Sequence, residues 1–120
     1  MASEGFHEAA DTLSPRTRDL HRAIVSLMEE LEAIDWYQQR VDATGDPALR
    51  EILEHNRDEE KEHAAMMLEW LRRHDATLDR HLRTYLFTDK SVLEIEAAAE
   101  GKDGAGSNDE GSLRIGSLRS

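Results

Sequence analysis

The sequence predicts an all-α protein, an antiparallel two-helix hairpin followed by a short C-terminal helix and a flexible tail. The only two prolines, Pro15 and Pro47, each follow a helix-capping residue, and Gly45 stands between them as a helix stop. Apolar residues in both segments recur every three or four positions, as they do on one face of an amphipathic helix. These observations predict two long helices joined by a tight turn.

The prolines also predict where each helix begins. The Ser14-Pro15 pair opens a helix over 15–43, and the Asp46-Pro47 pair opens a second over 47–75. So short a connection makes the two helices antiparallel neighbours.

The rest of the chain carries weaker signals. A short apolar segment covers 78–87, and Ser91 with Glu94 three residues later is a capping box that opens a short helix to about Glu100. From there on the composition turns to glycine, serine and acids. We therefore expect a disordered N-terminus over 1–13, a helical hairpin domain over 14–100 and a flexible linker over 101–112.

Composition narrows the classes of partner. The 120 residues include 26 acids and 15 bases, a formal net charge of -11, which argues against nucleic acid or an anionic membrane as the main partner. Without cysteine, disulfides and thiolate metal sites are excluded, and a reducing cytoplasm fits. No apolar run is long enough to span a bilayer, and we expect no secretory leader. The acids are therefore either solvated surface or ligands for hard cations.

Polar residues interrupt the apolar stripe of the second helix, whose middle passes through Asn56, Glu60, His63 and His74. Glu60 and His63 lie where a core helix would carry leucine, and their spacing of three places them on one face. Burying a carboxylate without a partner costs several kcal/mol, so something must compensate it. Glu-x-x-His on an inward helix face is the half-site arrangement of carboxylate-bridged di-iron bundles. The apolar residues of this stripe are Leu49, Ile52, Leu53, Met67, Trp70 and Leu71.

A third candidate ligand lies on the first helix. Glu30 flanks its apolar stripe at about the same distance from the turn as Glu60 and His63, with Tyr37 two turns further along. Between Ala23 and Gln39 there are four acids and no base, whereas a solvated face normally interleaves both signs. The stripe itself consists of Leu20, Ile24, Leu27, Met28, Leu31 and Ile34.

The number of candidate ligands in one chain predicts that two chains assemble around the site. A di-iron site of this class needs four carboxylates and two histidines, and one chain offers Glu30, Glu60 and His63. Two hairpins related by a two-fold axis supply the full set, and a lone hairpin has little core. We therefore expect the site at a dimer interface. Glu29, Glu32 and Trp36 share the opposite face of the first helix, either as plain surface or as a second acidic station for cations.

Two other interpretations stay open at this stage. In the first, the hairpin is a structural module whose acids are satisfied by Arg57, Arg72 or Arg73 from a partner. In the second, the di-metal site serves oxygen or peroxide sensing. The chain end, where Leu113, Ile115 and Leu118 return after the linker, is either a frayed terminus or a docking peptide.

Three strings closely resemble the encapsulated ferritins. They are MEELEAIDWY at 28–37, HNRDEEKEHAAM at 55–66 and LEWLRR at 68–73, and the resemblance covers about residues 14–90. It implies half of a ferritin-like four-helix bundle, which dimerises to complete a ferroxidase centre and closes into a decamer of five dimers.

The resemblance also implies roles for individual residues. It implies that Glu30, Glu60 and His63 bind a di-iron centre, two irons to each dimer interface, and oxidise Fe²⁺ with dioxygen. Glu29 and Glu32 would form a secondary metal position through which iron arrives, with Trp36 and Tyr37 beside the centre. Residues 113–120 resemble the peptide that docks cargo inside encapsulin shells, with Leu113, Ile115, Gly116, Ser117 and Leu118 as its anchors. The implied location is cytoplasmic, inside an encapsulin nanocompartment that stores the iron.

Overall fold

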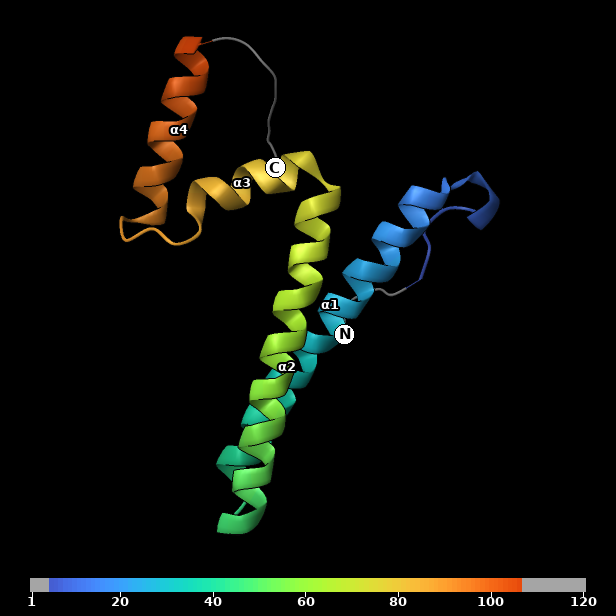
Figure 1. The fold of residues 1–120 in the computed structure, drawn as a ribbon, viewed down its shortest axis with the longest axis vertical. Helices are drawn as coiled ribbons and strands as arrows, with labels where there is room; N and C mark the ends of the chain where they lie inside the picture. The colour runs from blue at the N-terminus through green and yellow to red at the C-terminus, as the bar shows by residue number, and fades with distance from the viewer. Residues whose placement is uncertain (1–4, 107–120) are drawn as a thin grey trace. The chain divides into compact units, whose positions relative to one another are not determined.

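A computed structural model of the chain describes residues 5–106, and the described part is entirely helical apart from its connections. A short 3-10 helix, η1 (Ala10–Thr12), precedes α1 (Pro15–Ala43), α2 (Pro47–His74), α3 (Ala76–Tyr85) and α4 (Val92–Gly106) (Figure 1). The chain divides into two compact units, residues 1–76 and 77–120. The predicted all-α class is confirmed.

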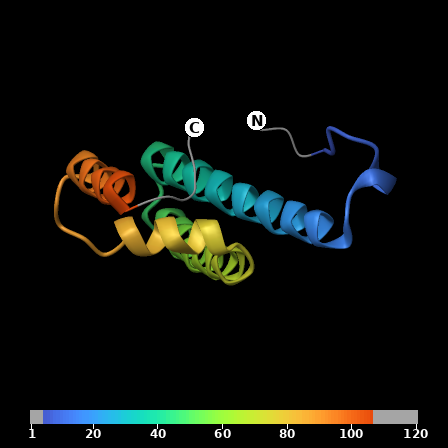
Figure 2. The same ribbon diagram turned by 90° about the horizontal axis from the view of Figure 1, so that it is seen from above.

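The first unit is the predicted hairpin. Both helices begin at their proline, because the side chain of Ser14 accepts a hydrogen bond from the amide of Thr17 and that of Asp46 accepts one from Ala48. Their observed bounds match the predicted ones to within one residue. Figures 1 and 2 show α1 and α2 running antiparallel, side by side, from the turn that joins them.

Arginines fix the register of the hairpin at both ends. At the turn, Arg50 donates to the carbonyls of Thr44 at 2.6 Å and Val41 at 3.3 Å. At the open end, Arg16 donates to the carbonyl of His74 at 2.5 Å. A cation at the C-terminal end of a helix satisfies carbonyls that have no partner within the helix. These contacts hold each residue of α1 level with its counterpart on α2.

The core between the two helices is thin. Its buried apolar residues in the described part are Ala23, Val41, Ala64 and Leu71, and no large side chain there is fully buried. Ile24, Leu31 and Ile52, which belong to the predicted apolar stripes, are about half exposed, with exposed fractions of 47%, 53% and 59%. A single hairpin therefore leaves much of its apolar surface in contact with water.

The segment before α1 corrects one expectation. Residues 1–13 are predicted to be disordered, yet residues 5–13 contain η1 and are held against α1. The Arg18 guanidinium donates to the carbonyl of Ala10, and the rings of Phe6 and His21 have centroids 4.6 Å apart. These contacts join residues eight and fifteen positions apart, which a local composition argument does not register.

The second unit contains α3 and α4. The amide of Ile95 donates to the carbonyl of Ser91 at 3.0 Å, so α4 begins where the capping box predicts. It continues to Gly106, past the expected end near Glu100, so the first six residues of the predicted linker 101–112 are helical. Within residues 5–106 no helix has the length and apolar character that crossing a bilayer requires. The predicted docking peptide lies outside the described residues.

Candidate metal centre

Three side chains with metal-binding atoms meet between α1 and α2. Glu30 comes from α1, and Glu60 and His63 come from α2; each offers one ligand atom, and these atoms all lie within 4.8 Å of one another. The His63 Nδ1 is 3.1 Å from a carboxylate oxygen of Glu60 and 3.8 Å from one of Glu30. Among the described residues no other group of three such side chains comes together in this way.

The hairpin's register brings the three residues together. Glu30 lies thirteen residues before Ala43, where α1 ends, and Glu60 lies thirteen residues after Pro47, where α2 begins. The two glutamates are therefore level across the hairpin, as the sequence predicts. His63 follows one helical turn after Glu60, so its ring reaches the same depth.

The charges of the cluster are not balanced within the chain. The pKa of Glu30 is raised because its carboxyl shares a hydrogen bond with Glu60 and is partly buried. The same bond lowers the pKa of Glu60, and the hydrogen bond from His63 lowers it further. Bonding to Glu60 in turn raises the pKa of His63. Two carboxylates this close repel each other, and a bound metal cation would offset that repulsion.

The donor set suits a hard or borderline transition metal. Carboxylate oxygens and an imidazole nitrogen are the ligands of non-haem iron and related ions. The side chains are partly accessible, with exposed fractions of 26% for Glu30, 22% for Glu60 and 41% for His63. The cluster is therefore consistent with a metal site that opens to the surface of the hairpin.

The remaining predicted site residues lie outside the cluster. Glu29 and Trp36 are exposed and Glu32 is partly exposed, all on the side of α1 turned away from α2. Tyr37 is half-buried on the same side of α1 as Glu30, and the Arg40 guanidinium lies 5.4 Å from its ring centre. The structure thus brings together three of the seven predicted metal-site residues and leaves four apart.

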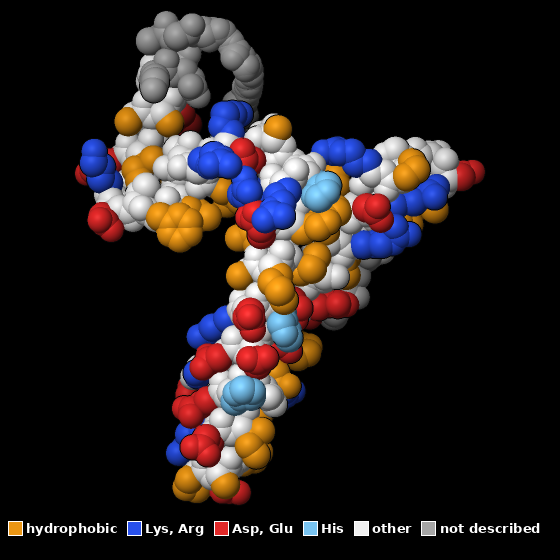
Figure 3. Space-filling view, viewed as in Figure 1, with side chains coloured by type: hydrophobic (Ala, Val, Ile, Leu, Met, Phe, Trp, Pro, Cys, Tyr) orange, Lys and Arg blue, Asp and Glu red, His pale blue; other side chains and the backbone are white. Residues whose placement is uncertain are grey.

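The hairpin has two sides, and the cluster occupies one of them. With about 100° of rotation per residue, His63 and Ile52 project from α2 on the side to which Glu30 and Glu60 incline, which we call the cluster face. Ile24 and Leu31 project from α1 on the opposite side, the far face, together with Gln38. Both faces expose apolar side chains, Ile52 on the cluster face and Ile24 and Leu31 on the far face. In the view of Figure 3, acidic side chains and histidines gather over the middle of the hairpin.

The arginines considered as partners for the buried acids bond elsewhere within the chain. Arg57 donates to Gln38 at 2.9 Å and to Asp58 at 3.0 Å. Arg72 and Arg73 both donate to Glu69, at 2.7 and 2.6 Å at the closest. Two guanidiniums hold the pKa of Glu69 down to about 2. These positive charges are therefore engaged by groups other than the cluster.

Comparison with known proteins identifies the family. The family model described as EncFtn-like matches residues 5–89, which is most of the chain. The chain belongs to the EncFtn-like family.

Relatives of this EncFtn-like protein include curated proteins and a solved structure. It is 56% identical to the encapsulated ferritin-like protein of Rhodospirillum rubrum, over 99% of this chain and 91% of the relative. It is 53% identical to a ferritin-like protein of Thermotoga maritima, over 97% and 99%. The encapsulin nanocompartment cargo protein EncC of Myxococcus xanthus is 33% identical, over 84% and 85%. A crystal structure of a Nitrosomonas europaea protein, 60% identical, superimposes with a TM-score of 0.72, covering 73% of this chain and 97% of the other.

Sequence reasoning missed the residues that position the centre of this EncFtn-like hairpin. Arg16 and Arg50 pin its two ends, and the bond between Arg57 and Gln38 joins the helices on the far face. Each arginine is one of several in the sequence, so none stands out by pattern alone. A usable signal was available for Arg50, which follows the turn closely enough to reach the last carbonyls of the first helix.

Proposed function

We propose that this protein is a ferroxidase that oxidises Fe²⁺ to Fe³⁺ with dioxygen at a di-iron centre shared by two copies of the chain. The observation that carries the proposal is the cluster of Glu30, Glu60 and His63, which lies open on an apolar face of a hairpin with little core. Membership of the EncFtn-like family supports the ferritin-like role. Iron is the substrate of the reaction as well as the occupant of the centre.

The number of ligands supports a dimer. A di-iron centre in a helical bundle takes four carboxylates and two histidines, and two clusters related by a two-fold axis provide that set. Ile52, 59% exposed on the cluster face, would then be covered by the second copy. Ile24 and Leu31 leave a second apolar patch on the far face, which supports contact with a further neighbour and closure into the decamer of five dimers.

Each ligand has a distinct proposed task. Glu60 would be the ligand shared by the two irons, because it lies between the other two ligands and hydrogen-bonds to both in the metal-free chain. Glu30 is a terminal carboxylate and His63 the nitrogen donor. Carboxylate oxygens favour Fe³⁺ over Fe²⁺, so this donor set makes oxidation of the metal easier.

The other predicted site residues have supporting roles in this proposal. Glu29 and Glu32 form a secondary position through which Fe²⁺ arrives, on the outer face of α1 near Trp36. Tyr37, on the same side of α1 as Glu30, stands beside the centre.

We further propose that the protein works inside an encapsulin shell in the cytoplasm. Its relatives carry the names encapsulated ferritin-like protein and encapsulin nanocompartment cargo protein. Residues 113–119 would dock to the shell, which would store the iron as mineral while this protein oxidises it. Co-expression with an encapsulin shell tests the docking: the full chain is expected to load, and replacing residues 113–119 by a Gly-Ser stretch of equal length is expected to prevent loading.

The central test is iron oxidation by matched variants. Glu60→Ala and His63→Ala are expected to lose most of the oxygen-dependent Fe³⁺ absorbance after anaerobic Fe²⁺ loading. Glu59→Ala removes the neighbouring acid, which is exposed and outside the cluster, and is expected to keep the wild-type rate. Equal rates in all four proteins would overturn the ferroxidase proposal.

Native mass spectrometry tests the shared site. Adding Fe²⁺ is expected to increase even-numbered assemblies, with two irons for every two chains. Iron bound to monomers at one ion per chain, without any change in assembly, would contradict a centre shared between copies.

A further inference from the structure

Methionines lie close to the candidate metal centre in the sequence of both helices. The described part of the chain contains Met28, Met66 and Met67. Met66 and Met67 follow His63 by three and four residues, about one turn of α2, and Met28 precedes Glu30 by two residues on α1. A flexible thioether fills irregular gaps in a core, and it is also the side chain that peroxide oxidises most readily after cysteine, which this chain lacks.

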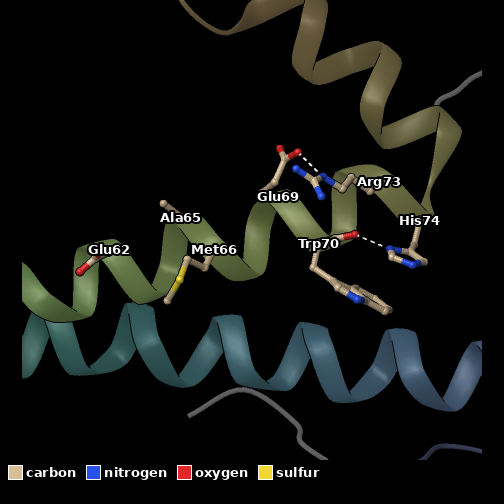
Figure 4. A pocket seen from close by; sticks show the side chains of 7 residues that line it. All are labelled: Glu62, Ala65, Met66, Glu69, Trp70, Arg73 and His74. Atoms are coloured by element: carbon tan, nitrogen blue, oxygen red, sulfur yellow. Dashed lines mark hydrogen bonds and ion pairs between the residues drawn. The ribbon is translucent and has the colours of Figure 1, made fainter.

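Accessibility separates Met66 from the other two. Its exposed fraction is 58%, whereas Met28 and Met67 are only partly exposed. Met66 lines an open furrow along α2 together with Ala65, Trp70 and other residues (Figure 4). It lies roughly 60° around the helix from His63, toward the outer edge of the cluster face. A small oxidant that leaves the centre can reach this sulfur without disturbing the core.

We propose that Met66 is a modification site that takes up peroxide released by the centre and becomes methionine sulfoxide. The proposal rests on the ferroxidase function. Two Fe²⁺ ions give one electron each to dioxygen, which takes up two protons and leaves as hydrogen peroxide. The Met66 sulfur attacks one peroxide oxygen, an S–O bond forms as the O–O bond breaks, and the other oxygen leaves as water. The sulfur loses two electrons and the peroxide gains them.

Oxidation at Met66 would protect neighbouring side chains that the metal centre and the interhelical contact need. His63 and the half-buried Met67 lie within one turn of it, and a sulfoxide at Met67 would place a polar group against the interhelical contact. An exposed thioether can accept oxygen with little structural consequence. The sulfoxide is also open to enzymatic reduction, so Met66 can be restored.

The test follows each methionine by tandem mass spectrometry after Fe²⁺ and air are added to the full-length protein. Sulfoxide at Met66 is expected to exceed that at Met67 about fivefold, and catalase is expected to remove the excess. Equal oxidation of the two methionines, or an excess that survives catalase, would overturn the proposal. Met67 is the internal control, because it is adjacent to Met66 in the sequence and lies at nearly the same position along the axis of α2.

Two leucine variants test protection. Met66→Leu is expected to keep the wild-type rate of iron oxidation and to raise the sulfoxide at Met67, whereas Met67→Leu leaves the oxidation of Met66 unchanged. If Met66→Leu leaves the oxidation of Met67 unchanged, Met66 intercepts nothing and the inference is wrong.

A separate arm distinguishes this inference from the ferroxidase function. Hydrogen peroxide is added to metal-free protein, and iron oxidation is recorded in parallel samples. One outcome is that the wild-type protein oxidises no iron while added peroxide still oxidises Met66 selectively. This outcome would overturn the ferroxidase proposal and, with it, the source of the peroxide. Normal iron oxidation with unselective oxidation by added peroxide would overturn the role of Met66 alone.

Discussion

Ile52→Ala is expected to weaken the proposed dimer without unfolding the hairpin. Ile52 lies on the cluster face, and 59% of its surface remains exposed in a single chain. A second copy placed across this face would cover it. Because the side chain projects away from the buried line of Ala64 and Leu71, shortening it removes little from the core within the chain.

The size of the effect follows from the exposed fraction. Complete burial of an isoleucine contributes roughly 1.5–3 kcal/mol. About half of this remains to be gained in the dimer and alanine keeps one methyl group, so the loss is about 1 kcal/mol per copy. A two-fold interface contains the residue twice, so the dimer loses about 2 kcal/mol and its dissociation constant rises about 30-fold.

Sedimentation equilibrium over a concentration series measures this change, and circular dichroism checks that helix content is kept. Leu93→Ala is the matched control, because Leu93 is 74% exposed but belongs to α4 in the second unit. Iron oxidation by the Ile52→Ala protein is expected to fall at low protein concentration and to recover at high concentration, by mass action. A dissociation constant that matches wild type, or that shifts equally in both variants, would refute the reasoning.

Three further predictions concern the single chain. The raised pKa of His63 means that its protonation stabilises the metal-free fold below the ordinary value of 6.5, and this contribution is lost as the pH rises through the raised value. The same proton opposes metal binding, so the affinity for Co²⁺ is expected to fall by up to about tenfold per pH unit below that pKa. Absorbance titrations measure this affinity, and an affinity that does not change with pH would contradict the prediction. Leu71→Ala is expected to lower the free energy of unfolding in urea by about 2 to 4 kcal/mol, because Leu71 is 5% exposed; a loss no larger than that of Leu93→Ala would argue against a core role. The pKa of Glu69, held near 2, means that its ion pairs stabilise the fold above pH 4.5 and fail as the pH falls toward 2, so the difference in melting temperature between wild type and Glu69→Gln is expected to shrink over that interval.

The bounds of the hairpin could be predicted because the signals are local. A capping side chain and a proline fix where a helix begins within four residues of sequence, and Ser14 and Asp46 make the hydrogen bonds that their pattern predicts. The level placement of Glu30 with Glu60 follows from those bounds, because equal distances from a tight turn determine depth in a hairpin.

What the sequence could not determine is which neighbour covers each apolar side chain. Periodicity places Ile24 and Leu31 in the apolar stripe of the first helix, yet both project sideways, onto the far face, and stay half exposed. One helix can cover only one side of another, so a broad stripe reports total apolar surface and not the surface buried within one chain. Contacts between distant residues were missed for a similar reason, and Phe6 on His21 is an example.

The exposed cluster and the exposed apolar face around it indicate that metal binding and dimer formation depend on each other. A dimer formed without metal would bring two copies of Glu30, Glu60 and His63 into a desolvated interface, where unpaired carboxylates cost several kcal/mol. In the proposed dimer, cations bound between the copies would offset that repulsion, so metal binding and association would be linked. Linkage is reciprocal, and any factor by which metal tightens the dimer is the factor by which dimer formation tightens metal. Ile52→Ala, which alters no ligand, must therefore also weaken apparent Co²⁺ affinity where the protein is dilute enough to dissociate, and the deficit must vanish as protein concentration rises. A deficit independent of concentration would mean that the substitution disturbs the cluster within one chain.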